Sequence, residues 1–77
     1  MPSAYVLINT ESGSEDYVLK QIRTIGAVKE AYVSYGVYDL IVKVRAEAMD
    51  ELKEIVSYKI RSLDKVRSTL TLMMVDE

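Results

Sequence analysis

Residues 31–44 (AYVSYGVYDLIVKV) constrain the fold most, because two apolar runs with β-strand character flank a glycine. Side chains of a strand point to alternate faces, and glycine at the first central position of a two-residue turn is typical of a type II′ hairpin. We therefore predict strands over 28–35 and 38–45 around a two-residue turn at Gly36 and Val37, with a longer loop around Gly36 as the alternative. A register shift of one residue would bury charge. The predicted partners are Lys29 opposite Val44, Ala31 opposite Val42, Val33 opposite Leu40 and Tyr35 opposite Tyr38 on one face, and Val28 opposite Arg45, Glu30 opposite Lys43, Tyr32 opposite Ile41 and Ser34 opposite Asp39 on the other.

Apolar periodicity places the other elements around this hairpin. Residues 5–8 are apolar on both faces, which predicts a central strand. Ser14 can cap a helix over 14–25 with Gly26 at its C-cap, residues 46–63 have the spacing of an amphipathic helix, and 66–75 alternate like a strand. The order β-α-β-β-α-β with right-handed crossovers gives a ferredoxin-like α+β fold. We expect a four-stranded antiparallel sheet in the order 4-1-3-2, with two helices on one face.

The other face of this sheet has no helix to cover it. Tyr5 and Leu7 lie on the opposite side of their strand from Val6 and Ile8, so both sides are apolar. Further candidates for the uncovered face are Tyr32, Ile41, Thr71 and Met73. A large exposed apolar face is unusual in a monomer, and a 77-residue chain without Cys has no disulfides to stabilise it. We expect two copies to pack sheet against sheet across a two-fold axis.

Composition excludes several classes of function. A net charge of −2 without a run of Lys or Arg is not the footprint of a nucleic-acid binder. No stretch is long and apolar enough to cross a membrane, and no signal peptide is recognisable, so a cytoplasmic protein is expected. The chain has no His or Cys and no glycine-rich phosphate motif, so we predict no catalytic residue, no metal site and no cofactor. Scarce Asn and Gln are compatible with a thermophilic source.

Asp39 directly follows the turn and allows two interpretations. A turn aspartate commonly hydrogen-bonds nearby backbone amides, which is a purely structural role. Alternatively, its carboxylate holds the ammonium group of a small zwitterion at a subunit edge, while free backbone N–H groups around Gly36 hold the carboxylate. The candidate site is then the loop itself, made of Ser34, Tyr35, Gly36, Val37, Tyr38 and Asp39.

The pattern Val28-x-x-Ala31-Tyr-x-x-x-Gly36-x-Tyr38-Asp39-Leu-Ile-Val-Lys-Val44 resembles the central signature of the RAM domain. This domain is the C-terminal effector-binding module of the Lrp/AsnC (feast/famine) transcription regulators. Residues 60–71 (IRSLDKVRSTLT) resemble its second helix exit and final strand, although Lys65 stands where the family has glycine. The resemblance covers nearly the whole chain. It implies a βαββαβ fold, dimers through the sheet faces, rings such as octamers, and an amino-acid effector bound where dimers meet.

The resemblance also implies which residues bind the effector. The family's Gly-Asp-Tyr-Asp type loop maps onto Gly36, Val37, Tyr38 and Asp39, with Val37 in place of the first acid. Hydroxyls expected from a neighbouring subunit map onto Ser68, Thr69 and Thr71.

The family's helix-turn-helix half has no counterpart within residues 1–77. We therefore expect a single stand-alone RAM domain over 1–77 that does not contact nucleic acid directly. Such a protein would sense an amino acid as a free oligomer, or modulate full-length Lrp/AsnC-type regulators by co-assembly.

Three alternatives stay open. An ACT domain shares the topology and binds amino acids between its first strand and helix, which here is the segment Glu11-Ser12-Gly13-Ser14. A ligand-free oligomerisation adaptor needs only the apolar sheet face. A small dimeric α/β-barrel enzyme would need a general base or an enclosed pocket, and the absence of His disfavours it.

Overall fold

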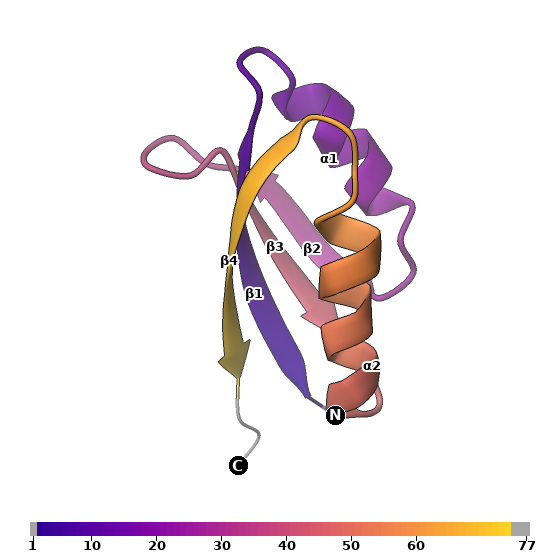
Figure 1. Cartoon of the computed structure of the whole chain (residues 1–77). Helices are drawn as coiled ribbons and strands as arrows, with labels where there is room; N and C mark the ends of the chain where they lie inside the picture. The colour runs from indigo at the N-terminus through magenta and orange to yellow at the C-terminus, as the bar shows by residue number, and fades with distance from the viewer. Residues whose placement is uncertain (1, 75–77) are drawn as a thin grey trace.

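The computed structural model describes residues 2–74 and contains the predicted order of strands and helices (Figure 1). Its elements are β1 (Ser3–Thr10), α1 (Glu15–Arg23), β2 (Val28–Val33), β3 (Leu40–Arg45), α2 (Met49–Glu54), the π-helical segment η1 (Ile55–Ile60) and β4 (Val66–Met74). All strand pairs are antiparallel, in the order β2-β3-β1-β4. The predicted α+β ferredoxin-like fold is therefore confirmed, apart from the predicted strand end at residue 75, which lies outside the described residues.

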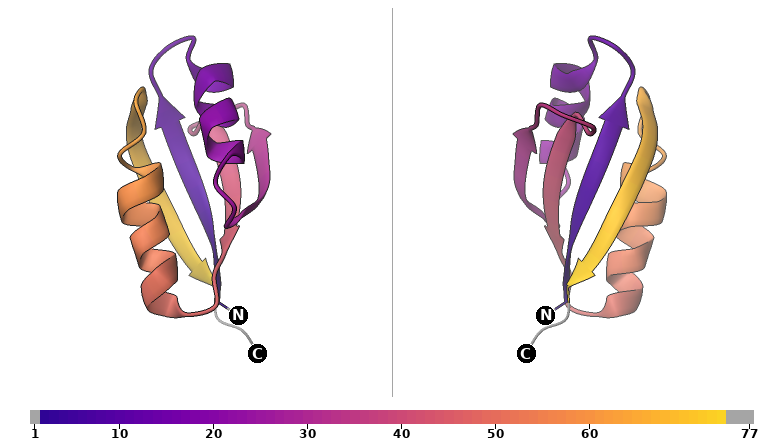
Figure 2. Two further views of the ribbon diagram at one scale, coloured as in Figure 1. Left: turned by 90° about the vertical axis from the view of Figure 1, so that its right-hand side faces the viewer. Right: turned by 90° about the vertical axis from the view of Figure 1, so that its left-hand side faces the viewer.

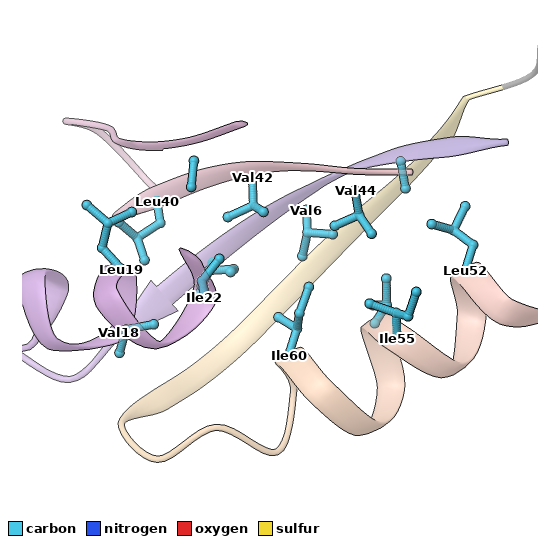
Figure 3. Packing of buried hydrophobic residues seen from close by; sticks show 14 of the residues in the cluster. Val6, Val18, Leu19, Ile22, Leu40, Val42, Val44, Leu52, Ile55 and Ile60 are labelled. Atoms are coloured by element: carbon cyan, nitrogen blue, oxygen red, sulfur yellow. The ribbon is translucent and has the colours of Figure 1, made fainter. Parts of the chain in front are cut away.

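Both helices lie on one side of the sheet, and the core fills the space between them (Figure 2). Side chains at even positions of β1 and β3, such as Val6 and Val42, point toward the helices and are fully buried. From the opposite side, Ile22 of α1 and Leu52 and Ile60 of the second helix are also fully buried (Figure 3). This arrangement leaves the odd positions of the central strands without a helical cover.

The predicted register of the hairpin is confirmed over most of its length, whereas the two-residue turn is wrong and the longer loop around Gly36 is present. Val33 pairs with Leu40 and Glu30 with Lys43, as expected. The strands, however, end at Val33 and resume at Leu40, and residues 34–39 form a loop rather than a two-residue turn. Gly36 has φ 157°, whereas the first central residue of a type II′ turn has φ of about +60°. The loop is closed at its base, where the Ser34 N–H donates to the Asp39 carbonyl oxygen at 2.8 Å.

A bulge in β2 changes the end of the predicted hairpin register. Val28 pairs with Val44 rather than Arg45, and the register shifts between Val28 and Glu30, so Lys29 does not pair with Val44. The shift keeps Val28 packed against the core, where its apolar side chain is partly buried.

A second bulge, in β4, corrects the predicted faces of that strand. Ser68 pairs with Asn9 and Val66 pairs with Thr10, which leaves Arg67 as the extra residue. Val66 therefore packs against the core instead of sharing a face with Ser68. The prediction that Thr71 and Met73 lie on the uncovered face is also wrong. Thr71 pairs with Val6 and Met73 with Ala4, which places both side chains on the helix side of the sheet.

Both helices are shorter than predicted: residues 15–23 instead of 14–25, and 49–60 instead of 46–63. The first helix ends at Arg23, and its C-cap is Thr24 in a right-handed conformation, so the prediction of a Gly26 cap is wrong. The second helix runs from Met49 to Ile60, with its last six residues in a π-helical conformation. After it, Lys65 has φ 73°, a left-handed conformation that usually favours glycine. No helix within residues 2–74 is long and apolar enough to cross a membrane.

Candidate functional site

The loop between β2 and β3 projects from the sheet on the side away from the helices (Figures 1 and 2). Its tip is open to solvent, with Tyr35 96% and Val37 84% exposed. Tyr38 and Ser34 are partly buried nearer the base of the loop. The structure thus brings together the predicted residues 34–39 as one exposed segment with a fixed base.

Asp39 fixes that base through long-range contacts. Its backbone N–H donates to the Ile8 carbonyl oxygen at 2.9 Å. Its Oδ2 accepts hydrogen bonds from the Thr10 backbone N–H at 2.9 Å and from the Thr10 hydroxyl at 3.3 Å. The structural interpretation of Asp39 predicted a hydrogen bond from a backbone amide, and the carboxylate does accept one. The donor, however, is in β1 and not in the turn. Its other oxygen, Oδ1, has no hydrogen-bond partner among the described residues.

A polar hollow lies beside this carboxylate, at the ends of β1 and β4. It has a volume of about 380 Å³, and every residue lining it is polar or charged: Asn9, Thr10, Asp39, Arg67 and Ser68. The Asn9 amide donates to the Ser68 hydroxyl at 3.4 Å across the two strands. A negative and a positive side chain thus border one hollow, which is the charge pattern that a zwitterion complements.

A second hollow of about 430 Å³ lies on the other side of Asp39. It is lined by Glu15 and Asp16 of α1 together with Val33, Ser34, Tyr35 and Asp39. Its acidic lining suits a cation, so the two hollows beside Asp39 differ in the charge they present.

The structure does not bring all the predicted ligand residues together within one chain. Ser68 lines the polar hollow with Asp39. Thr69 and Thr71 line a hollow of about 280 Å³ against the second helix, with Lys53, Val56, Ser57, Arg61 and Met73. Thr69 also borders a smaller hollow together with Ser68. Their predicted contribution to the site of a neighbouring subunit stays a prediction.

Sequence reasoning missed Asn9, Thr10 and Arg67 as neighbours of Asp39. Arg67 reaches the hollow because of the bulge in β4. No signal of this bulge is visible in the sequence, because Val66, Leu70 and Leu72 all lie at even positions of an unbroken alternation. Asn9 and Thr10 gave no local signal, because only the pairing of β1 with its neighbours places them there.

The uncovered sheet face carries a continuous set of apolar side chains. Leu72 pairs with Tyr5 and Leu70 with Leu7, so these side chains share that face, and Leu70 and Leu72 are 43% and 47% exposed. We call this surface the open face, defined by Tyr5, Leu7, Tyr32, Ile41, Leu70, Leu72 and Met74.

Polar groups edge the open face near β2. The Lys43 ammonium lies 5.8 Å from the centre of the Tyr5 ring and 4.0 Å from Glu30 Oε2, which confirms the predicted Glu30–Lys43 pair. The Tyr32 hydroxyl donates to Glu30 Oε1 at 2.8 Å. This hydrogen bond, together with the charge of Glu30, raises the pKa of Tyr32 above its usual value.

Comparison with known proteins identifies the class of domain that this fold defines. The profile of the Lrp/AsnC ligand binding domain matches residues 3–77. The chain therefore belongs to the Lrp/AsnC ligand binding domain family, as the resemblance of the hairpin implied.

Individual proteins are similar to this chain over different shares of their own length. The regulatory protein AsnC of Escherichia coli strain K12 is 31% identical over 64 residues, which are 80% of this chain and 42% of AsnC, so the chain spans less than half of that relative. Homocitrate synthase of Saccharolobus islandicus is 38% identical over 72 residues, or 90% of this chain and 15% of the enzyme. Among solved structures, the hypothetical protein PHS023 from Pyrococcus horikoshii is 38% identical with a TM-score of 0.93, covering 100% of this chain and 93% of that chain.

Proposed function

We propose that this chain is a non-enzymatic domain that binds an amino acid beside Asp39 and assembles with further copies through its open face. The observation that carries the proposal is the Asp39 carboxylate, which lines an all-polar hollow and keeps one oxygen unbonded within residues 2–74. A carboxylate in this position can accept hydrogen bonds from an α-ammonium group. Membership of the Lrp/AsnC ligand binding domain family supports this chemistry.

The remaining ligand contacts belong to the loop and to a neighbouring subunit. Backbone N–H groups around Gly36 lie in an exposed loop and are suited to a carboxylate. Thr69 and Thr71 lie on the helix side of β4, away from the loop. In our proposal they complete the site of an adjacent copy, so that binding and assembly are coupled.

Assembly begins with a dimer through the open face. Leu70, Leu72 and Met74 are each more than 40% exposed on the same side of β4, and burial of such apolar surface contributes about 25 cal/mol per Å². A sheet face that packs against its own copy across a two-fold axis buries this apolar surface on both copies at once. Dimers then associate into a higher ring such as an octamer, which creates the shared ligand site.

The regulatory role follows from the same interfaces. We propose that residues 1–77 act as one RAM-type domain without direct DNA contacts. Its surfaces for dimer and ring formation would also accept the corresponding domain of a full-length Lrp/AsnC-type regulator. Support comes from the 31% identity with AsnC of Escherichia coli, which is a regulatory protein.

Two rivals differ from this proposal in a measurable way. In an ACT-like site the ligand would bind at Gly13, but the Gly13 N–H already donates to Glu15 Oε1 at 3.2 Å. A ligand-free adaptor would form the same oligomers without responding to any amino acid. The enzymatic alternative is least supported, because the match to homocitrate synthase concerns only 15% of that enzyme's length.

A thermal-shift screen of the purified protein against the twenty amino acids tests binding. A ligand at 100 times its dissociation constant should stabilise the native state by about 2.7 kcal/mol, which raises the melting temperature on the order of 10 °C for a domain of this size. The informative variant is Asp39→Asn, because its amide oxygen still accepts from the Thr10 N–H while the charge is lost. We expect Asp39→Asn to fold and to lose the ligand-induced shift.

Asp39→Ala is a poorer control. It leaves the buried Thr10 amide without its acceptor, which costs about 1–3 kcal/mol irrespective of any ligand. If no amino acid shifts the wild-type protein and its oligomeric mass stays constant, the chain is an adaptor and the sensor proposal fails. A ligand-induced shift that persists in Asp39→Asn would instead place the ligand elsewhere, such as at the ACT-type position around Gly13.

A further inference from the structure

Two irregularities of the backbone bring arginine side chains to one hollow at the beginning of β4. The bulge inserts Arg67 between Val66 and Ser68. In the preceding helix, the π-helical segment ends with the Arg61 N–H donating to the Val56 carbonyl oxygen at 3.0 Å. Bulges and π-helical turns re-aim single side chains and are frequent at functional sites. Here Arg61, which follows the π-helical segment, and Arg67, the bulge residue, border the same hollow. It has a volume of about 260 Å³ and is lined by Arg61, Val66, Arg67, Ser68 and Thr69.

This arginine hollow is cationic. No carboxylate is among the residues that line it, and neither Arg61 nor Arg67 forms an ion pair within residues 2–74. Two like charges beside one hollow repel each other, and an anion placed between them removes that cost. A guanidinium group binds carboxylates through two parallel hydrogen bonds, and the Ser68 hydroxyl can donate one more.

The arginine hollow adjoins the polar hollow beside Asp39, because Arg67 and Ser68 line both. Together the two hollows present one negative and two positive side chains, namely Asp39, Arg61 and Arg67. An acidic amino acid carries the complementary set of one ammonium and two carboxylates. In the proposed function the loop N–H groups bind the α-carboxylate, so a neutral amino acid would leave both arginines without a counter-charge.

We propose that the effector of this chain is an acidic amino acid whose side-chain carboxylate lies between Arg61 and Arg67. This inference rests on the proposed amino-acid binding at Asp39 and names the class of ligand. Val37, the residue beside Gly36 in the loop, is uncharged. The loop therefore adds no negative charge there that would repel such a ligand.

Calorimetric titration of the oligomeric protein with L-glutamate, L-aspartate and their amides L-glutamine and L-asparagine tests the inference. Each pair differs only in the charge of the side chain. We expect at least one acid to bind about tenfold or more tightly than its amide, the scale expected for hydrogen bonds between charged groups. The difference should shrink between 0.05 and 0.5 M salt, since exposed charges are screened with a Debye length of about 10 Å at 0.1 M.

Substitutions then assign the preference to the two arginines. Arg67→Gln and Arg61→Gln should each reduce affinity for the acid about tenfold while changing affinity for the amide less than twofold. Lys59→Gln is the matched control, because it removes one positive charge from the same helix at a hollow shared with Glu51 and Glu54 instead, and we expect it to leave both affinities unchanged. Unchanged melting temperatures of the unliganded variants exclude a folding defect.

The outcomes separate this inference from the proposed function. If the amide or an apolar amino acid such as L-leucine binds as tightly as the acid, amino-acid binding stands and the acidic preference is wrong. The same holds if both arginine variants weaken acid and amide equally. If succinate binds as tightly as the amino acid and Asp39→Asn has no effect, the hollow is a plain anion site and both proposals fail.

Discussion

Lysine in place of Leu72 is expected to split the proposed dimer into monomers. Leu72 is 47% exposed at a position opposite Tyr5, within the open face. In a face-to-face dimer its side chain would lose contact with water, and a lysine ammonium buried there without a partner costs several kcal/mol per ion. Light scattering or analytical ultracentrifugation over a dilution series should show the wild-type mass at least twice that of the variant.

The matched control is Tyr58→Lys, which places the same charge at another exposed apolar position. Tyr58 is 75% exposed on the outer side of the second helix, at a hollow lined by Glu51 and Glu54. We expect this variant to keep the wild-type mass. A Leu72→Lys protein that stays dimeric would show that the copies do not meet through the open face.

The register of the hairpin could be predicted because it depends on local alternation. Ala31, Val33, Leu40 and Val42 all need the covered face, and the pair Glu30 and Lys43 fits only one alignment. The length of the loop could not be predicted in the same way. It is decided by Asp39, whose N–H and carboxylate are bound to Ile8 and Thr10 of β1, about 30 residues earlier in the chain.

The bulges show a second limit of sequence reasoning. A single extra residue, Arg67, exchanges the two faces of a strand without changing its composition. Strict alternation over 66–75 therefore assigned Thr71 and Met73 to the wrong side, although the strand itself was predicted correctly. The arginine hollow could not be predicted for the same reason, since it exists only where the bulge and the π-helical turn meet.

Only some residues of the candidate site could be predicted from the sequence. Gly36 and Asp39 mark the loop through turn chemistry, and Ser68 lies beside Asp39 as part of the same hollow. Asn9, Thr10 and Arg67 come from strands that are adjacent only in the folded sheet. Charge complementarity across such a hollow depends on tertiary pairing, which local periodicity does not encode.

Alanine in place of Ile22 should cause the largest loss of folding stability. Ile22 is fully buried between the first helix and the sheet, near Leu40 and Val42 (Figure 3). Truncation of a buried isoleucine costs about 2–5 kcal/mol, because the transfer free energy of the lost groups adds to that of the cavity they leave. A domain of 77 residues has a total stability of only about 4–12 kcal/mol. Urea unfolding followed by circular dichroism should therefore show a strongly lowered midpoint or an unfolded chain.

Two further variants make this measurement specific to the core. Ile22→Val keeps most of the volume and should cost about 0.5–1.5 kcal/mol, while Gln21→Ala changes an exposed neighbour on the same helix and should stay within about 0.5 kcal/mol of wild type. Because the proposed dimer would stabilise the native state by mass action, we expect the midpoint of every variant to rise with protein concentration. Combining Ile22→Ala with Leu72→Lys should remove that dependence and leave a monomer that cannot fold. If Ile22→Ala unfolds at the wild-type midpoint, the first helix does not pack on the sheet through this residue.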